Sequence, residues 1–226
     1  MNRNISIVAD DFGITQKVND VIIDLIIKKK ITDTSCIVLT KNFKKDSKNL
    51  NDLPVKFGKG IHITLTDFNS VTSPKSISFN GKLPTFYQLF LKIYKGQVLV
   101  DDIVNEINSQ LDIFEDFVGS KPNFIDGHHH VHQLPIISNI LIKLIKKRYN
   151  EDPPFVRNTH ESNIKILKRN ICLTKTFLLS HYGYFFKKKL INNNFKTNNG
   201  FSGIYDFSKN TKYDHLFNKF IKYVDH

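Results

Sequence analysis

The chain has 226 residues, of which 40% are hydrophobic, and this length and composition suit one domain with a substantial core. No apolar run approaches the ~20 residues of a membrane-spanning helix, and the N-terminal segment lacks the apolar core of a signal peptide, so we expect a cytoplasmic protein. The net charge of +12 comes mainly from lysines in short, scattered clusters, which favours solvated helix ends over a nucleic-acid surface. Cys36 and Cys172 stand far apart and predict no disulfide.

The first part of the chain alternates between short β-branched runs and stretches with apolar residues at helical spacing. We predict strands over residues 5–9, 35–39 and 60–65, with helices over residues 15–30 and 44–53 between them. Thr15 is a candidate N-cap for the first helix.

A long polar stretch, residues 66–84, separates this part from the next and has the character of a functional loop. Further strands are predicted over residues 122–127 and 155–157, and helices over residues 85–95, 100–118, 135–149, 162–170, 178–191 and 213–224. Alternation of this kind predicts an α/β fold with a mostly parallel sheet, in which catalytic residues gather at the carboxyl ends of the strands.

Two adjacent carboxylates, Asp10 and Asp11, follow the first predicted strand. Burying them is costly unless a partner compensates their charge. A turn is one interpretation, because Asp is common in turns that contain glycine. The functional interpretation gives one carboxylate to a metal ion and the other to general-base catalysis, since neighbouring residues of a strand point in different directions.

Histidines occur inside one further predicted strand, residues 60–65, and after another, residues 122–127. His62 alone would be an ordinary buried histidine, but residues 126–132 read DGHHHVH and add four more. If strand geometry continues through this run, alternate residues share one face: Asp126, His128, His130 and His132. His129 and Val131 would then face the other way. A surface tract that binds metal adventitiously is the alternative, but the run continues a buried strand and leads into a helix, which favours a site for a divalent metal.

At this point a family resemblance emerges from three motifs: VADDFG at residues 8–13, GIHITLT at residues 60–66 and FIDGHHHVH at residues 124–132. In this order and spacing they resemble the YdjC-like carbohydrate deacetylases, a family that includes chitooligosaccharide deacetylase. Val18-Asn19 and Pro135 also match, and weaker matches at residues 155–157 and 200–203 extend the resemblance over nearly the whole chain.

The resemblance implies a distorted TIM-like (β/α) barrel with mostly parallel strands, and a hydrolase that removes an acetyl group from an N-acetylated sugar. It implies that Asp11, His62 and His128 are the metal ligands and that Asp10 is the catalytic base. The cofactor would be one divalent metal ion: Mg²⁺ is usual in the family, whereas histidine ligands suit Zn²⁺ better, and we keep both. The expected partner is a small carbohydrate, without nucleic acid or membrane, and with a homodimer left open.

Three further residues are candidates for substrate contact: His130, His132 and Arg157. Either histidine would protonate the leaving amine if this chain lacks the C-terminal histidine that is the family's candidate general acid. Arg157 would hold a sugar hydroxyl or a phosphate as a bidentate donor, although a surface ion pair is an equal alternative.

Members of the family continue past the helix that matches residues 213–224 into a strand and a Glu-containing segment with a His-Pro-Gly turn, whereas this chain ends at residue 226. We therefore expect a single carbohydrate-deacetylase-like domain over residues 1–226, truncated at its C-terminus. The missing segment is expected to affect catalytic turnover more than metal binding. Two other functions stay open: a non-catalytic metal or sugar binder, and a metal-dependent hydrolase of another small polar substrate such as a phosphoester.

Overall fold

The structure, a computed structural model, describes residues 5–207 and 212–223. The chain divides into two compact units: Ser6–Phe155, which we call the sheet unit, and Val156–His226 with Met1–Ile5, which we call the C-terminal unit. The expected single domain over the whole chain stays a prediction. Across the described residues, no helix combines the length and apolar character needed to cross a membrane.

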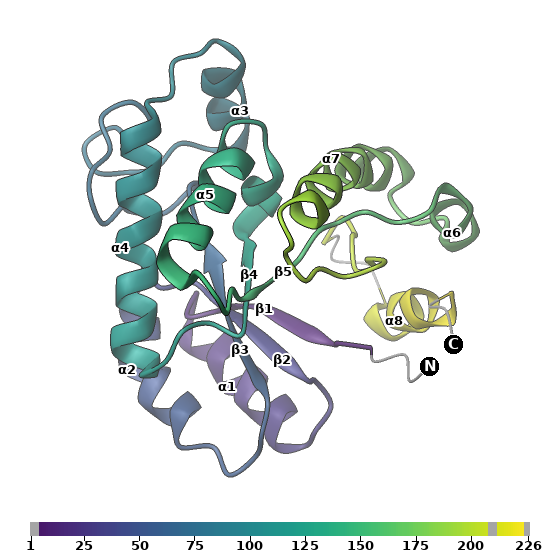
Figure 1. Ribbon diagram of the computed structural model, residues 1–226. Helices are drawn as coiled ribbons and strands as arrows, with labels where there is room; N and C mark the ends of the chain where they lie inside the picture. The colour runs from purple at the N-terminus through teal and green to yellow at the C-terminus, as the bar shows by residue number, and fades with distance from the viewer. Residues whose placement is uncertain (1–4, 208–211, 224–226) are drawn as a thin grey trace. The chain divides into compact units, whose positions relative to one another are not determined.

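The sheet contains β1 (Val8–Phe12), β2 (Asp33–Cys36), β3 (Gly58–Ile63), β4 (Phe124–Gly127) and β5 (Phe155–Val156), which lie side by side in chain order (Figure 1). The pairs β1–β2, β2–β3 and β3–β4 are parallel. Among the described residues the sheet runs from β1 to β5 without closing on itself. The predicted α/β class with parallel strands is confirmed, and the open sheet is consistent with a distorted TIM-like barrel.

The helices of the sheet unit are α1 (Gln16–Ile27), α2 (Lys41–Asn51), α3 (Phe86–Tyr94), α4 (Val100–Val118), the 3-10 helix η1 (His128–Gln133) and α5 (Ile137–Tyr149). Helix α1 packs against β1 and α2, α2 packs against α4, and α4 packs against β3 and α5. Their contact surfaces are apolar and fully buried at Phe43, Phe114 and Ile145. These helices pack on the strands and hold them in place. The loops that follow the strands can therefore carry polar side chains without loss of the core.

Most helices lie close to their predicted ranges, although the one predicted over residues 178–191 begins at Leu173, and the first three strands are displaced by two or three residues. Thr15 caps α1 as predicted, because its side chain accepts a hydrogen bond from the Val18 amide. Strand β1 begins three residues later than expected and includes Asp10 and Asp11 rather than preceding them. Its pairing with β2 shifts register between Ala9 and Phe12, which marks an irregularity at the two aspartates. Apolar patterning does not predict this irregularity. The pattern identifies a strand by its apolar residues, whereas this strand contains two aspartates where its register shifts.

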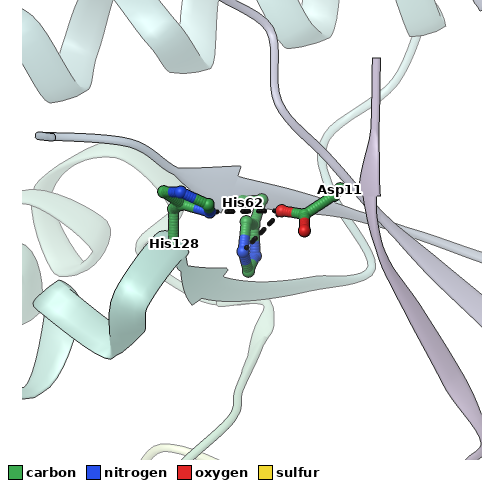
Figure 2. Close-up of side chains that lie close together, drawn as sticks. All are labelled: Asp11, His62 and His128. Atoms are coloured by element: carbon green, nitrogen blue, oxygen red, sulfur yellow. Dashed lines mark hydrogen bonds and ion pairs between the residues drawn. The ribbon is translucent and has the colours of Figure 1, made fainter. Parts of the chain in front are cut away.

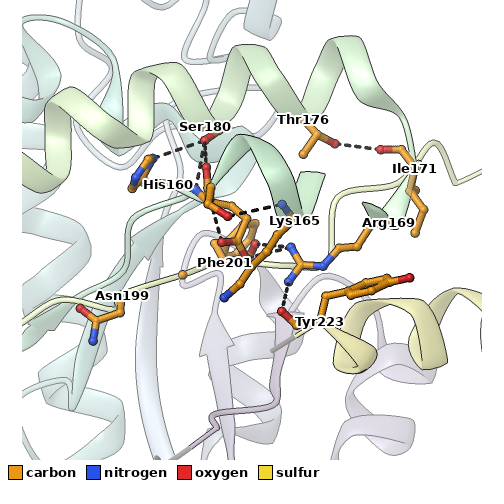
Figure 3. A network of polar contacts seen from close by, with 12 residues as sticks. His160, Lys165, Arg169, Ile171, Thr176, Ser180, Asn199, Phe201 and Tyr223 are labelled. Carbon is orange, nitrogen blue, oxygen red and sulfur yellow. Dashed lines mark hydrogen bonds and ion pairs between the residues drawn. The ribbon is translucent and has the colours of Figure 1, made fainter. Parts of the chain in front are cut away.

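The C-terminal unit contains α6 (Asn163–Arg169), α7 (Leu173–Asn192) and α8 (Tyr213–Lys222). A buried ion pair joins Glu161 to Arg169 at 2.8 Å, and Arg169 also donates to the carbonyls of Phe201 and Tyr223 (Figure 3). The predicted helix over residues 213–224 is confirmed as far as Lys222. Residues 224–226, where we expected the chain to depart from its family, lie outside the described part.

Candidate metal centre

Three side chains from three strand ends converge in the sheet unit: Asp11, His62 and His128 (Figure 2). Asp11 Oδ1 lies 3.2 Å from His128 Nδ1 and 3.5 Å from His62 Nε2. One ligand atom from each residue lies within 4.8 Å of the other two. Ligand atoms bound at ~2.1 Å to one tetrahedral ion stand roughly 3.4 Å apart. The spacing therefore suits one shared metal ion.

The position of Asp11 depends on a tight turn after β1. Asp11 itself has a positive φ of 68°, and Gly13 has a φ of 105°, where an added Cβ would lie 2.5 Å from the Ile37 carbonyl oxygen. The Gly13 amide donates to Asn19 Oδ1 at 2.6 Å, and Asn19 Nδ2 donates to Asp46 at 2.7 Å. Asn19, which the family resemblance matched after the first motif, is fully buried and holds this turn in place.

His62 is oriented by a buried carboxylate on the neighbouring strand. Parallel pairing places His62 opposite Asp126, and the His62 Nδ1–Asp126 Oδ1 distance is 2.5 Å. Ser35 donates a second hydrogen bond to the same Asp126 oxygen at 2.5 Å. Burial acts to lower the pKa of His62, but the charge of Asp126 and the hydrogen bond to it, together with the charges of Asp10 and Asp11, outweigh burial and raise the pKa. With Nδ1 on Asp126, His62 presents Nε2 to Asp11, as metal-ligating histidines with a carboxylate partner do.

The histidine run does not continue as a strand, so the predicted alternation of faces is wrong. Strand β4 ends at Gly127, and η1 begins at His128. His129 and His130 have φ values of 52° and 57°, which turns the chain sharply within the run. His128 still reaches Asp11, but it does so from the start of η1 and not through the alternation of a strand.

His129, which we expected to face away, lies beside the site. Its ring centroid is 4.1 Å from that of His128, and its Nδ1 is 3.3 Å from Asp67 Oδ2 and 3.2 Å from Thr66 Oγ1. Burial and the neighbouring His128 lower the pKa of His129. Asp67, His128 and His129 form a second group with metal-ligand spacing, which shares His128 with the first.

The other candidates occupy different surroundings. Asp10 lies in β1 with an oxygen within 4.8 Å of ligand atoms of His62 and Asp126. His132 is completely buried, and its Nδ1 would be 2.8 Å from a Cβ added at Gly127, so the two residues are closely packed. His130 is partly exposed. The roles expected for these three residues stay predictions.

Arg157 belongs to the C-terminal unit, where it is 8% exposed. Its guanidinium carbon lies 5.7 Å from the centroid of the Phe201 ring, so the two weaker motifs, residues 155–157 and 200–203, meet in a cation–π contact. A surface ion pair, the alternative expected for Arg157, does not fit a buried side chain. Its predicted substrate contact stays a prediction.

The electrostatics of the cluster also favour a cation. Burial acts to raise the pKa of Asp11, but the hydrogen bond with His128 and the charges of His62 and His128 outweigh burial and hold the pKa below its usual range. One carboxylate oxygen and two imidazole nitrogens suit Zn²⁺ or a similar transition metal, whereas Mg²⁺ prefers oxygen ligands. The residues present therefore fit a divalent metal. Asp126, to which the sequence pattern gave no role of its own, orients the ligand His62.

The chain is similar in sequence to known proteins. The chitooligosaccharide deacetylase of Proteus mirabilis is 29% identical over 140 residues, which are 62% of this chain and 54% of the relative. That of Salmonella typhimurium is 28% identical over 148 residues, which are 66% of this chain and 58% of the relative. The matched regions thus span a little over half the length of these relatives.

The chain is also similar to a solved structure from Enterococcus faecalis, described as a “putative cellobiose-phosphate cleavage protein”. The TM-score is 0.56 at 21% identity, over 78% of this chain and 63% of that one. At this identity the likeness supports the fold alone. A family model described as YdjC-like protein matches residues 4–225, and since this is nearly the entire sequence, the chain belongs to the YdjC-like family.

Proposed function

We propose that the protein is a metal-dependent hydrolase that removes the acetyl group from an N-acetylated sugar of the chito-oligosaccharide type. The observation that carries this proposal is the convergence of Asp11, His62 and His128 from three separate motifs. Family membership and the names of the two deacetylase relatives support the substrate class.

Asp11, His62 and His128 would hold the metal, with Zn²⁺ favoured by the donor set and Mg²⁺ kept by the family resemblance. A bound divalent ion supplies Lewis acidity, which polarises an amide carbonyl and makes water a better nucleophile. The contribution of the protein is to fix the ligands. Asp126 accepts from His62 Nδ1 and is itself held by Ser35, so His62 Nε2 needs no reorientation when the ion binds.

Asp10 is proposed as the general base that takes a proton from the attacking water. It is close to His62 and Asp126, and it is not one of the three converging ligands. Of the two histidines expected to protonate the leaving amine, His132 is completely buried, so we assign this step to His130, which is partly exposed. Acid–base assistance of this kind contributes ~10²–10⁴-fold to a rate.

The test is acetate release from a panel of N-acetylated sugars, with metal-stripped protein to which each divalent metal is added separately. Asp10→Asn should retain metal and lose about 10²-fold or more of the activity. Asp24→Asn is the matched control, because Asp24 is an exposed aspartate of α1 that pairs with Lys28. Equal loss of metal and activity in Asp10→Asn would show that Asp10 is a ligand and not the base.

Other outcomes separate the alternatives. Hydrolysis of p-nitrophenyl phosphate without acetate release would indicate a phosphoesterase. Sugar affinity and bound metal without release of either product would indicate a non-catalytic binder.

A further inference from the structure

Helix α3 carries an aromatic side chain at every fourth position: Phe86, Phe90 and Tyr94. Their rings form a continuous row, with centroids 6.3 Å apart for the first pair and 4.5 Å apart for the second. At its N-terminal end the row meets the metal centre, because the Phe86 ring lies 6.0 Å from that of His129, which packs against His128. A chain of ring contacts thus leads from a candidate metal ligand to the exposed end of a helix.

The start of α3 is held near the site by the loop before it. The Asp67 amide donates to the Pro84 carbonyl at 2.9 Å, and the Leu83 amide donates to the Phe68 carbonyl at 2.8 Å, so the base of this long loop is closed. A capping box between Thr85 and Gln88 then begins the helix. The start of α3 is therefore held by hydrogen bonds that do not involve the aromatic side chains.

The row is not the core face of α3. Leu89 and Ile93 supply that face and are 0% and 5% exposed, whereas Tyr94 is 58% exposed and Phe86 and Phe90 are half-buried. The one charged side chain of α3, Lys92, donates to the Ser76 carbonyl. The exposed part of the row is thus aromatic and uncharged, which suits a neutral ligand with apolar faces.

We infer that Phe86, Phe90 and Tyr94 bind the further sugar units of a neutral N-acetylated oligosaccharide whose reacting unit lies at Asp11, His62 and His128. This inference rests on the proposed function and deepens it by assigning the residues that select for chain length. The C–H face of a pyranose ring packs on an aromatic ring, as apolar surfaces do in ligand sites. From Phe86 to Tyr94 the helix rises ~12 Å, about the length of two sugar units.

The inference predicts that Tyr94 matters for long substrates and not for short ones. With Tyr94→Ala, we expect the KM for a pentasaccharide to rise about three- to tenfold, the scale of one aromatic contact, with kcat unchanged. The KM for a disaccharide should stay the same, because two units do not reach Tyr94. Tyr87→Ala is the matched control: Tyr87 lies on the same helix, is 68% exposed and is outside the row. Phe90→Leu is a second variant that keeps apolar volume and should also raise the pentasaccharide KM.

Equal effects of Tyr94→Ala on both substrates, or equal effects of Tyr87→Ala and Tyr94→Ala, would overturn the inference. Calorimetric binding of the pentasaccharide to metal-stripped protein separates this failure from failure of the proposed function. Loss of affinity in Tyr94→Ala without acetate release in any variant would support the row and refute deacetylation. Acetate release with pentasaccharide affinity that Tyr94→Ala leaves unchanged would refute the row and support deacetylation.

Discussion

Each unit of the chain holds a carboxylate among nitrogen-bearing side chains, but the two clusters use their polar atoms differently. In the sheet unit, Asp11 faces two imidazole nitrogens at 3.2 and 3.5 Å, and its side chain is 36% exposed. In the C-terminal unit, the side chains of Glu161 and Arg169 are 6% and 7% exposed. There the carboxylate also accepts from the Ser162 amide, and the guanidinium also donates to backbone carbonyls.

The two clusters differ in whether their polar atoms remain available to bind a further atom such as a metal ion. The Glu161–Arg169 pair is surrounded by donors and acceptors of the protein, which is the condition for a buried ion pair to be tolerated. The Asp11 cluster instead directs three potential ligand atoms toward one another at metal-ligand spacing. Convergence and access, and not charge alone, therefore distinguish the candidate site from an ion pair that holds helices together.

The strongest test of this comparison removes a ligand. His62→Ala should abolish stoichiometric metal binding and lower deacetylation by at least about a thousandfold, because a catalytic metal contributes several kcal/mol. Metal content by mass spectrometry and acetate release measure the two effects. His160→Ala, which alters a histidine beside Ser180 in the C-terminal unit, is the control and should change neither. Full metal content in His62→Ala would contradict the site.

The converse test breaks the buried ion pair. Arg169→Met should destabilise the C-terminal unit by about 3–5 kcal/mol, because it leaves the Glu161 carboxylate buried without its cation. Hydrogen exchange should accelerate in α6 and α7, while metal affinity stays unchanged. The double variant Glu161→Gln/Arg169→Met should recover much of the loss. Loss of metal affinity in Arg169→Met would show that this pair does more than hold helices.

The same contrast shows what the sequence could predict. Asp11, His62 and His128 were identifiable because they lie in or directly after predicted strands in three recognisable motifs, and the strand–helix alternation was sufficient for the fold class. The register shift at Asp10–Asp11 and the sharp turn at His129–His130 were not, because apolar patterning specifies neither the pairing register of a strand nor a positive φ. Strand parity therefore assigned His129 to the wrong face. The role of Asp126 also depends on register, since β3 and β4 place it opposite His62 across 64 positions of sequence.

A smaller effect is expected from the outer partner of the site. Asp126→Asn should weaken metal affinity about 10- to 100-fold, because His62 loses the carboxylate that fixes its orientation. Glu161→Gln is the matched control, since Glu161 is also a buried carboxylate with a close partner and lies outside the cluster, in the C-terminal unit. Both variants should lose some stability, as titrations with denaturant would show. Only Asp126→Asn should lose metal affinity, and equal losses in both would refute the orienting role.

The pH dependence of metal binding tests the same contact. Burial opposes protonation of His62, but Asp126 acts together with the charges of Asp10 and Asp11 and raises the His62 pKa above its usual 6.5. A metal must displace that proton, so affinity should fall about tenfold per pH unit below the raised pKa. In Asp126→Asn the fall should begin at lower pH. Calorimetric titration of stripped protein between pH 5 and about 8 would measure both curves, since histidines titrate in this range. Identical curves would contradict the coupling.

The smallest predicted effect is one in which the two units should behave alike. Thr85 caps α3 and Ser162 caps α6, each accepting from a backbone amide at 3.4 Å. Thr85→Ala and Ser162→Ala should therefore each cost about 1 kcal/mol of stability, seen as faster hydrogen exchange in the capped helix, with metal affinity unchanged. Thr85→Ser and Ser162→Thr keep the hydroxyl and serve as controls. Caps depend only on local backbone chemistry. A large difference in stability loss between Thr85→Ala and Ser162→Ala would therefore mean that one helix start is held mainly by tertiary packing.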